Sequence, residues 1–219
     1  MKKINKSTSP EAEAAIDRTL IYIPIIHTEA DMGKLSGPVR RAALQKLGLR
    51  GLKNKSNLID KIWTQIEKTV EGLDLSFEKV RLYQDGLPVC GKESGIVADL
   101  AAKSRNHRLL MRLMDKGAMI MGTESPEFLL EEYELAKKFL AVGGNLKSMK
   151  IEAHQKQVSD ILLKRRDQFI ADRINATLGP GETGILLLGM LHSLGHLLNG
   201  QIKVIYPISG PFNRRDRMA

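Results

Sequence analysis

Short apolar runs alternate with longer, more polar stretches along this chain. The first run, TLIYIPII (residues 19–26), is continuous and rich in β-branched residues, which is typical of a strand buried on both faces. Four later runs have the same character: KVRLY (79–83), AMIM (118–121), ILLLGML (185–191) and IKVIYPI (202–208). The stretches between them show helical periodicity. This alternation predicts an α/β fold with a mainly parallel central sheet, flanking helices and a helical insertion after the first strand, over residues 29–77.

The length of 219 residues fits one domain spanning residues 1–219, with flexible ends at 1–9 and 210–219. Within the insertion, residues 57–70 are expected to be helical and residues 48–57 to form a loop. The only cysteine, Cys90, excludes an internal disulfide bond. The basic start of the chain is followed by no apolar stretch, and no run approaches 18 apolar residues. We therefore expect a cytoplasmic protein without a membrane span.

The net charge of +9 admits an anionic partner. Its basic residues are spread over several segments, and aromatic residues make up only 5% of the chain, so stacking platforms for single-stranded nucleic acid are scarce. Nucleic-acid binding is therefore kept only as an alternative function, and a solvated basic surface is the preferred explanation of the charge.

Four of the apolar runs are followed by an ionisable residue. His27 follows the first, Asp85 the second, Glu124 the third and His192 the fourth. Because ligands of open parallel sheets bind beyond the carboxyl ends of the strands, we expect these four side chains to converge on one cleft. Polar residues at a sheet edge that simply meets water would produce the same pattern.

Two imidazoles and a carboxylate can hold zinc, manganese or iron and leave positions open for water. The predicted ligands are His27, Glu124 and His192, with Asp85 orienting one of them or activating water, so that Asp85 and Glu124 are candidate catalytic groups. Without a metal, the same groups could transfer protons. Glu29 and Asp31, which follow His27 closely, could support this group.

Two other segments come close to known motifs. DGLPVCGKES (85–94) almost reproduces a phosphate-binding loop, but Glu93 stands where a hydroxyl should bind magnesium, and Pro88 lacks a backbone donor. HSLGH (192–196) has the spacing of a zinc-protease motif without its glutamate. Neither is adopted as a site. His107, His154 and His196 are interpreted as solvated helical positions, and Cys90 stays a minor candidate nucleophile.

PIIH near the start, RRDQFIADRI in a helix and GILLLGMLH near the end together resemble the superfamily of erythromycin esterases, ChaN haem-binding lipoproteins and TraB/pheromone-shutdown proteins. That pattern has two G-x-x-H motifs and an R-D-x-x-M-A-like helix. Residues 189–192 match the second G-x-x-H motif, Arg166, Asp167 and Ala171 match the helix, and Pro24 departs from the first motif. The resemblance implies a cleft used by esterases, proposed metalloproteases or haem binders.

Arg166 and Arg173 lie two turns apart on one helix face, where a guanidinium could neutralise carboxylates, bind an anionic substrate or stabilise developing negative charge. A salt-bridged surface helix would show the same pattern. The leading hypothesis is therefore a metal-assisted hydrolase of esterase or peptidase type acting on a small molecule or peptide. The first alternative is a non-enzymatic regulator that binds haem, a metal or a small ligand; as a cofactor, a divalent metal is expected ahead of haem.

Overall fold

The computed structural model describes residues 17–141 and 149–208, in which five strands form one parallel sheet in the order β3-β2-β4-β1-β5. The strands are β1 (Arg18–Ile25), β2 (Val80–Gln84), β3 (Met119–Met121), β4 (Thr183–Gly189) and β5 (Ile202–Ile205). The helices are η1 (Glu29–Leu35), α1 (Ser36–Glu71), η2 (Phe77–Lys79), α2 (Glu93–Ala101), α3 (Arg105–Asp115), α4 (Pro126–Ala141) and α5 (Met149–Thr177). The predicted α/β fold, with helices inserted after the first strand, is confirmed.

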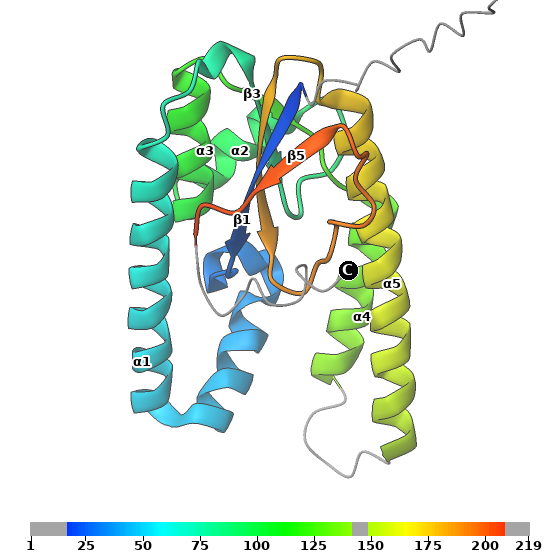
Figure 1. Cartoon of the computed structure of the whole chain (residues 1–219). Coiled ribbons are helices and arrows are strands. Elements are labelled where there is room, and N and C mark those ends of the chain that lie inside the picture. The colour runs from blue at the N-terminus through cyan, green and yellow to red at the C-terminus, as the bar shows by residue number, and fades with distance from the viewer. Residues whose placement is uncertain (1–16, 142–148, 209–219) are drawn as a thin grey trace, which may run out of the picture.

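The sheet is covered on both faces, which explains why its strands are continuous apolar runs (Figure 1). Odd-numbered residues of β1, such as Ile21 and Ile23, pack with α1, α2 and α3 on one face. Even-numbered residues, such as Leu20 and Tyr22, pack with α5 on the other. Strand geometry sends successive side chains to opposite faces, so each run must be apolar at every position.

Helix α1 differs from the expectation of a loop over residues 48–57. Gly48 has a positive φ of 67°, which interrupts the helix there, but the chain is helical again directly after it. The result is a hairpin with a short arm (36–47) and a long arm (49–71), seen in Figure 1 as two helices joined at one end. The long arm buries Trp63, Ile66 and Val70 against the sheet, whereas Leu58, one turn before Ile62, is exposed.

Helices α2 and α3 are separated near Ser104, whose side chain accepts a hydrogen bond from the backbone of His107 at the start of α3. No helix of the described residues combines the length and the hydropathy that a membrane span requires. The predicted flexible ends, 1–9 and 210–219, lie outside the described residues.

Gly184 of β4 marks a place where side chains of the two neighbouring strands lie so close that a further side chain does not fit. A Cβ added at this residue would lie 2.7 Å from Leu20 Cδ1 and 3.2 Å from Tyr83 Cε2. We expect Gly184→Ala to lower the free energy of unfolding by about 1–3 kcal/mol, because the packed core must shift. Chemical denaturation measures this. The matched control is Gly200→Ala, whose Cβ would meet nothing within 4 Å; equal losses in both variants would contradict the packing argument.

Candidate functional site

The carboxylate of Asp85 lies at the centre of a polar cluster over the carboxyl ends of β1, β2 and β4. Its Oδ2 atom accepts hydrogen bonds from Nε2 of His27 at 2.9 Å and from the backbone N–H of Gly189 at 2.8 Å. Its Oδ1 atom accepts one from Arg166 at 3.0 Å. The Asp85 side chain is only 4% exposed. Asp85 is held in place because its own N–H donates to Leu187, which extends the pairing of β2 with β4 by one residue.

The G-x-x-H segment at the end of β4 is a tight turn. The N–H of His192 donates to the carbonyl of Gly189, so three residues carry the imidazole back over the strand end. A Cβ at Gly189 would lie 2.7 Å from Asp85 Oδ2, 3.3 Å from His27 Nε2 and 3.7 Å from His192 Cδ2. A glycine is needed because the carboxylate and both imidazoles surround this position.

His192 belongs to a second carboxylate–imidazole pair. Its Nδ1 atom donates to Oδ1 of Asp167 at 2.5 Å, and Asp167 Oδ2 also accepts the N–H of Ser193 at 3.1 Å. The opposite ring nitrogen, Nε2, lies 3.6 Å from Asp85 Oδ2. Asp167 therefore fixes the ring so that Nε2 faces the central carboxylate. In the sequence, Asp167 stands out only as part of the R-D-x-x-M-A-like motif, and it was not predicted to be a site residue.

Arg166 joins the carboxylates of the cluster. Its guanidinium donates to both oxygens of Glu124, at 2.8 and 2.6 Å, as well as to Asp85 and to Glu132 at 2.5 Å. Glu124 is fully buried, and Gly86 also donates its N–H to Oε1 at 3.2 Å. With a side chain 5% exposed and three carboxylate partners, Arg166 stabilises the cluster itself and does not present its charge to solvent.

The carboxylates of the cluster outnumber its one permanent cation. Three buried carboxylates, those of Asp85, Glu124 and Asp167, face the single positive charge of Arg166. Unpaired charge is costly in such surroundings, so the excess negative charge favours a further cation, supplied either by protons on His27 and His192 or by a metal ion.

The pKa directions follow from this imbalance. Burial disfavours protonated His27, but its hydrogen bond to Asp85 and the charge of that carboxylate outweigh burial and raise its pKa above 6.5. The pKa of His192 is raised in the same way, with burial opposed by Asp167 and Asp85. Burial alone would raise the pKa of Asp85, but the two histidines and Arg166 hold it well below its usual range.

Asp85, Glu124 and His192 could together hold a metal ion, because one ligand atom from each lies within 4.8 Å of the others. The predicted set contained His27 in place of Asp85. The chemistry of the donors fits a divalent ion, since two carboxylates and an imidazole oriented by a further carboxylate are common ligands. Arg166 already donates to both carboxylates, so an ion bound by them would have to displace its guanidinium.

The loop that carries His27 is fixed by Asp31, one of the two acids proposed as supporting groups. Asp31 Oδ2 accepts from the N–H and the hydroxyl of Thr28, at 2.7 and 2.8 Å, and Oδ1 accepts from Ser104 at 2.6 Å. His107 bonds to the same Ser104 at 2.9 Å and is buried, which corrects its interpretation as a solvated residue. The link joins the loop after β1 to the start of α3.

Arg173 and residues 90–93 make no hydrogen bond to the carboxylates of the cluster. Arg173 donates to the carbonyl of Gly122 at 3.3 Å and contacts none of the cluster carboxylates. In residues 85–94, which resemble a phosphate-binding loop, Oε1 of Glu93 accepts hydrogen bonds from the N–H groups of Cys90 and Gly91, at 2.8 and 2.9 Å. A glutamate carboxylate thus occupies the backbone donors that a phosphate would use. Cys90 is exposed, and His154 and His196 are exposed as expected.

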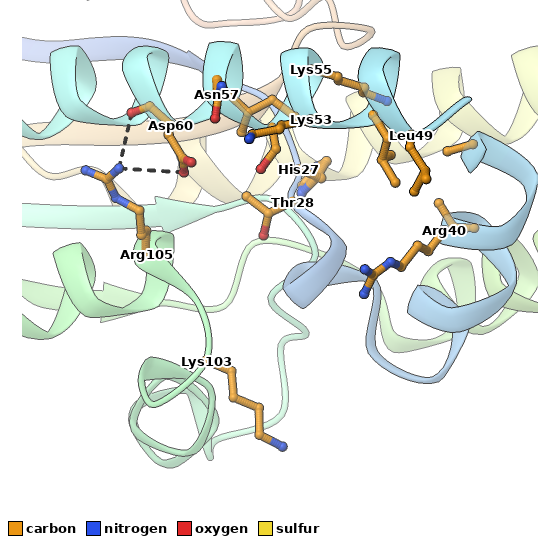
Figure 2. Close-up of a pocket in the computed structure, with 15 residues that line it drawn as sticks. His27, Thr28, Arg40, Leu49, Lys53, Lys55, Asn57, Asp60, Lys103 and Arg105 are labelled. Carbon is orange, nitrogen blue, oxygen red and sulfur yellow. Dashed lines mark hydrogen bonds and ion pairs between the residues drawn. The ribbon is translucent and has the colours of Figure 1, made fainter. Parts of the chain in front are cut away.

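A pocket of about 750 Å³ lies beside the cluster, between the arms of α1 and the junction of α2 and α3. Figure 2 shows Arg40 on the short arm, Lys53 on the long arm, and His27 with Thr28 between these helices. The His27 side chain is 33% exposed, whereas those of Asp85 and His192 are 4% exposed. His27 therefore connects the buried cluster to the pocket.

Comparison of the chain with protein-family models, with curated proteins and with solved structures finds no match. The resemblance to the erythromycin esterase superfamily accordingly stays a prediction.

The structure brings all four strand-end residues together. His27 and His192 both lie within 3.6 Å of the same oxygen of Asp85, and Glu124 is joined to Asp85 through Arg166.

The His27–Asp85 pair can be tested by the titration of His27. NMR titration of the wild-type protein should give a His27 pKa above 6.5, and Asp85→Asn should lower it, because burial then acts without an adjacent negative charge. Asp99→Asn, which removes an exposed carboxylate outside the cluster, is the matched control and should leave the His27 pKa unchanged. A His27 pKa that does not respond to Asp85→Asn would contradict the assignment.

Proposed function

We propose that the protein is a hydrolase in which His27 acts as the general base on water, oriented by Asp85. The observation that carries the proposal is the position of the His27 ring: one nitrogen is bound to a buried carboxylate while the side chain remains one-third exposed at the edge of a pocket. The resemblance to esterases in the sequence agrees with this reaction class.

The tautomer of His27 follows from its partner. Because a carboxylate only accepts hydrogen bonds, Nε2 must carry the proton that is donated to Asp85, and in the neutral ring Nδ1 is then the basic nitrogen. A water molecule in the pocket that bonds to Nδ1 would lose its proton to this atom as it attacks a carbonyl or phosphoryl centre. Asp85 would stabilise the imidazolium that forms, as the positioning residue of the pair.

The buried part of the cluster has a supporting role in this mechanism. Arg166 keeps Asp85 ionised and fixed, and the Gly189 N–H orients the oxygen that His27 contacts. A divalent ion held by Asp85, Glu124 and His192 would supply Lewis-acid activation of the substrate or of water. With such an ion bound, residues of the chain would still orient His27 and transfer the proton.

Hydrolysis of chromogenic carboxylic and phosphate esters tests the proposal. We expect His27→Gln to lower kcat/KM by about 10²–10⁴-fold, the usual contribution of a general base. The base must be neutral to act, and the pKa of His27 is raised, so kcat/KM of the wild type should rise as the pH increases through a value above 6.5. Asp85→Asn should move this rise in kcat/KM to lower pH. His196→Gln, which changes an exposed histidine, should keep full activity; His27→Gln with the same activity would exclude His27 as the base.

Metal binding is tested separately, by elemental analysis after dialysis against zinc or manganese. We expect a bound ion that is lost in His192→Ala and in Glu124→Gln but retained in His27→Ala, because His27 is outside the group whose ligand atoms converge. Binding should release protons, since a metal-bound imidazole must be deprotonated and His192 has a raised pKa. Equal occupancy in wild type and His192→Ala would contradict this ligand set, and loss in His27→Ala would favour the set predicted from the sequence.

A further inference from the structure

The pocket beside His27 has a chemical character that the proposed reaction does not use. Its charged lining residues are five cations and one acid: Arg40, Lys53, Lys55, Lys103, Arg105 and Asp60. Arg105 is paired with Glu67 and lies near Asp60. None of the described acidic residues lies within ion-pair distance of Lys53, Lys55 or Lys103. These lysines leave a positive potential over the pocket that an anionic ligand would neutralise.

The sequence around the pocket reinforces this bias. Between Ser36 and Ile59, which includes the bend of α1, the chain carries six basic residues and no acidic residue. Helix surfaces usually intersperse both signs, because pairs of opposite charge three or four residues apart stabilise the helix. In a segment without acidic residues the cations repel one another, and a bound anion would reduce this repulsion.

The walls between the arms of α1 are apolar. The short arm contributes Val39 and Ala43, and the long arm contributes Leu49, Leu52 and Ile59. Leu49 is 78% exposed, far more than a leucine with a permanent packing partner. A volume of about 750 Å³ lies in the range of small-molecule sites, so the pocket could enclose a medium-sized apolar chain or ring.

We propose that this pocket binds an amphipathic organic anion, a molecule with an apolar body and a carboxylate or phosphate group. The apolar body would lie between the arms of α1, and the anionic group would contact the lysines. The inference deepens the proposed function, on which it rests, by naming the substrate class: an ester or amide of such an anion. Arg166, expected from the sequence to bind an anionic substrate, cannot do so because its guanidinium is held by three carboxylates.

Probes without a hydrolysable bond separate binding from catalysis. Octanoate and octylphosphonate should bind by calorimetry at low salt and weaken as salt is added, whereas octyltrimethylammonium, a cation of similar length, should not bind. Butanoate should bind at least about tenfold more weakly than octanoate, because less apolar surface is buried.

Variants of the lysines locate the site. Lys53→Ala and Lys55→Ala should each weaken octanoate binding by about fivefold, as expected for one exposed ion pair. The double variant Lys53→Glu/Lys55→Glu should abolish it. Lys61→Glu is the matched control, because Lys61 is exposed on the same helix but does not line the pocket; it should bind octanoate normally. Circular dichroism confirms that each variant is folded.

The outcomes distinguish this inference from the proposed function. Octanoate binding without ester hydrolysis would support the pocket and contradict the hydrolase. Hydrolysis of neutral and anionic esters at equal rates, with no octanoate binding, would overturn the pocket and leave the hydrolase. Binding only to vesicles of anionic phospholipid, or only to duplex DNA, would also overturn it, because the basic α1 hairpin would then serve a membrane surface or a nucleic acid. If Lys61→Glu weakened octanoate binding as much as Lys53→Ala does, the anion would bind outside this pocket, and the inference would be overturned.

Discussion

The buried charge of Asp85 is the constraint on which the site depends. An ionised carboxylate this far from solvent is tolerated only with several partners of the right polarity. Asp85 obtains them from distant parts of the chain: His27 after β1, Arg166 on α5 and the N–H of Gly189 at the end of β4. The parallel pairing of β2 with β4 and of β4 with β1 brings these partners within reach. Removing any one partner would leave the others to stabilise a charge that they share.

The surroundings of Asp85 explain two features of the G-x-x-H segment. The glycine of the G-x-x-H segment provides both space and a donor, because a side chain at Gly189 would occupy the position of the Asp85 carboxylate. The two residues between glycine and histidine are those of a turn that returns the His192 ring to the strand end. Pro24, which departs from the first motif, does not prevent His27 from reaching Asp85.

The sequence predicted the fold and the convergence of the strand-end residues, because a parallel sheet places the carboxyl ends of its strands together. It predicted that Asp85 would orient one of the ligands, but it did not decide which role Arg166 takes or identify the partner of His192. Whether Arg166 faces solvent or the carboxylates depends on how α5 packs, and periodicity leaves that open. Asp167 lies one position further along the same helix, and its pairing with His192 depends on the turn after β4. The helical continuation after Gly48 was missed because the glycines, asparagines and serine of residues 48–57 favour a loop locally. The long arm is stabilised further along by Trp63, which packs on the sheet and donates to the carbonyl of Ile26.

The buried cluster and the pocket contain different cations, and only those of the pocket are available to bind a substrate anion. Arg166 cannot both compensate Asp85 and Glu124 and bind a substrate anion, since its donors are already used. Recognition of charge must then come from side chains outside the cluster, and the lysines of the α1 hairpin face the same pocket as His27. Because recognition and proton transfer reside on different elements, substitutions in the hairpin could change the preferred substrate while the His27–Asp85 pair is preserved. The hairpin and the sheet are joined at Trp63, so the position of the pocket relative to His27 is set by the core.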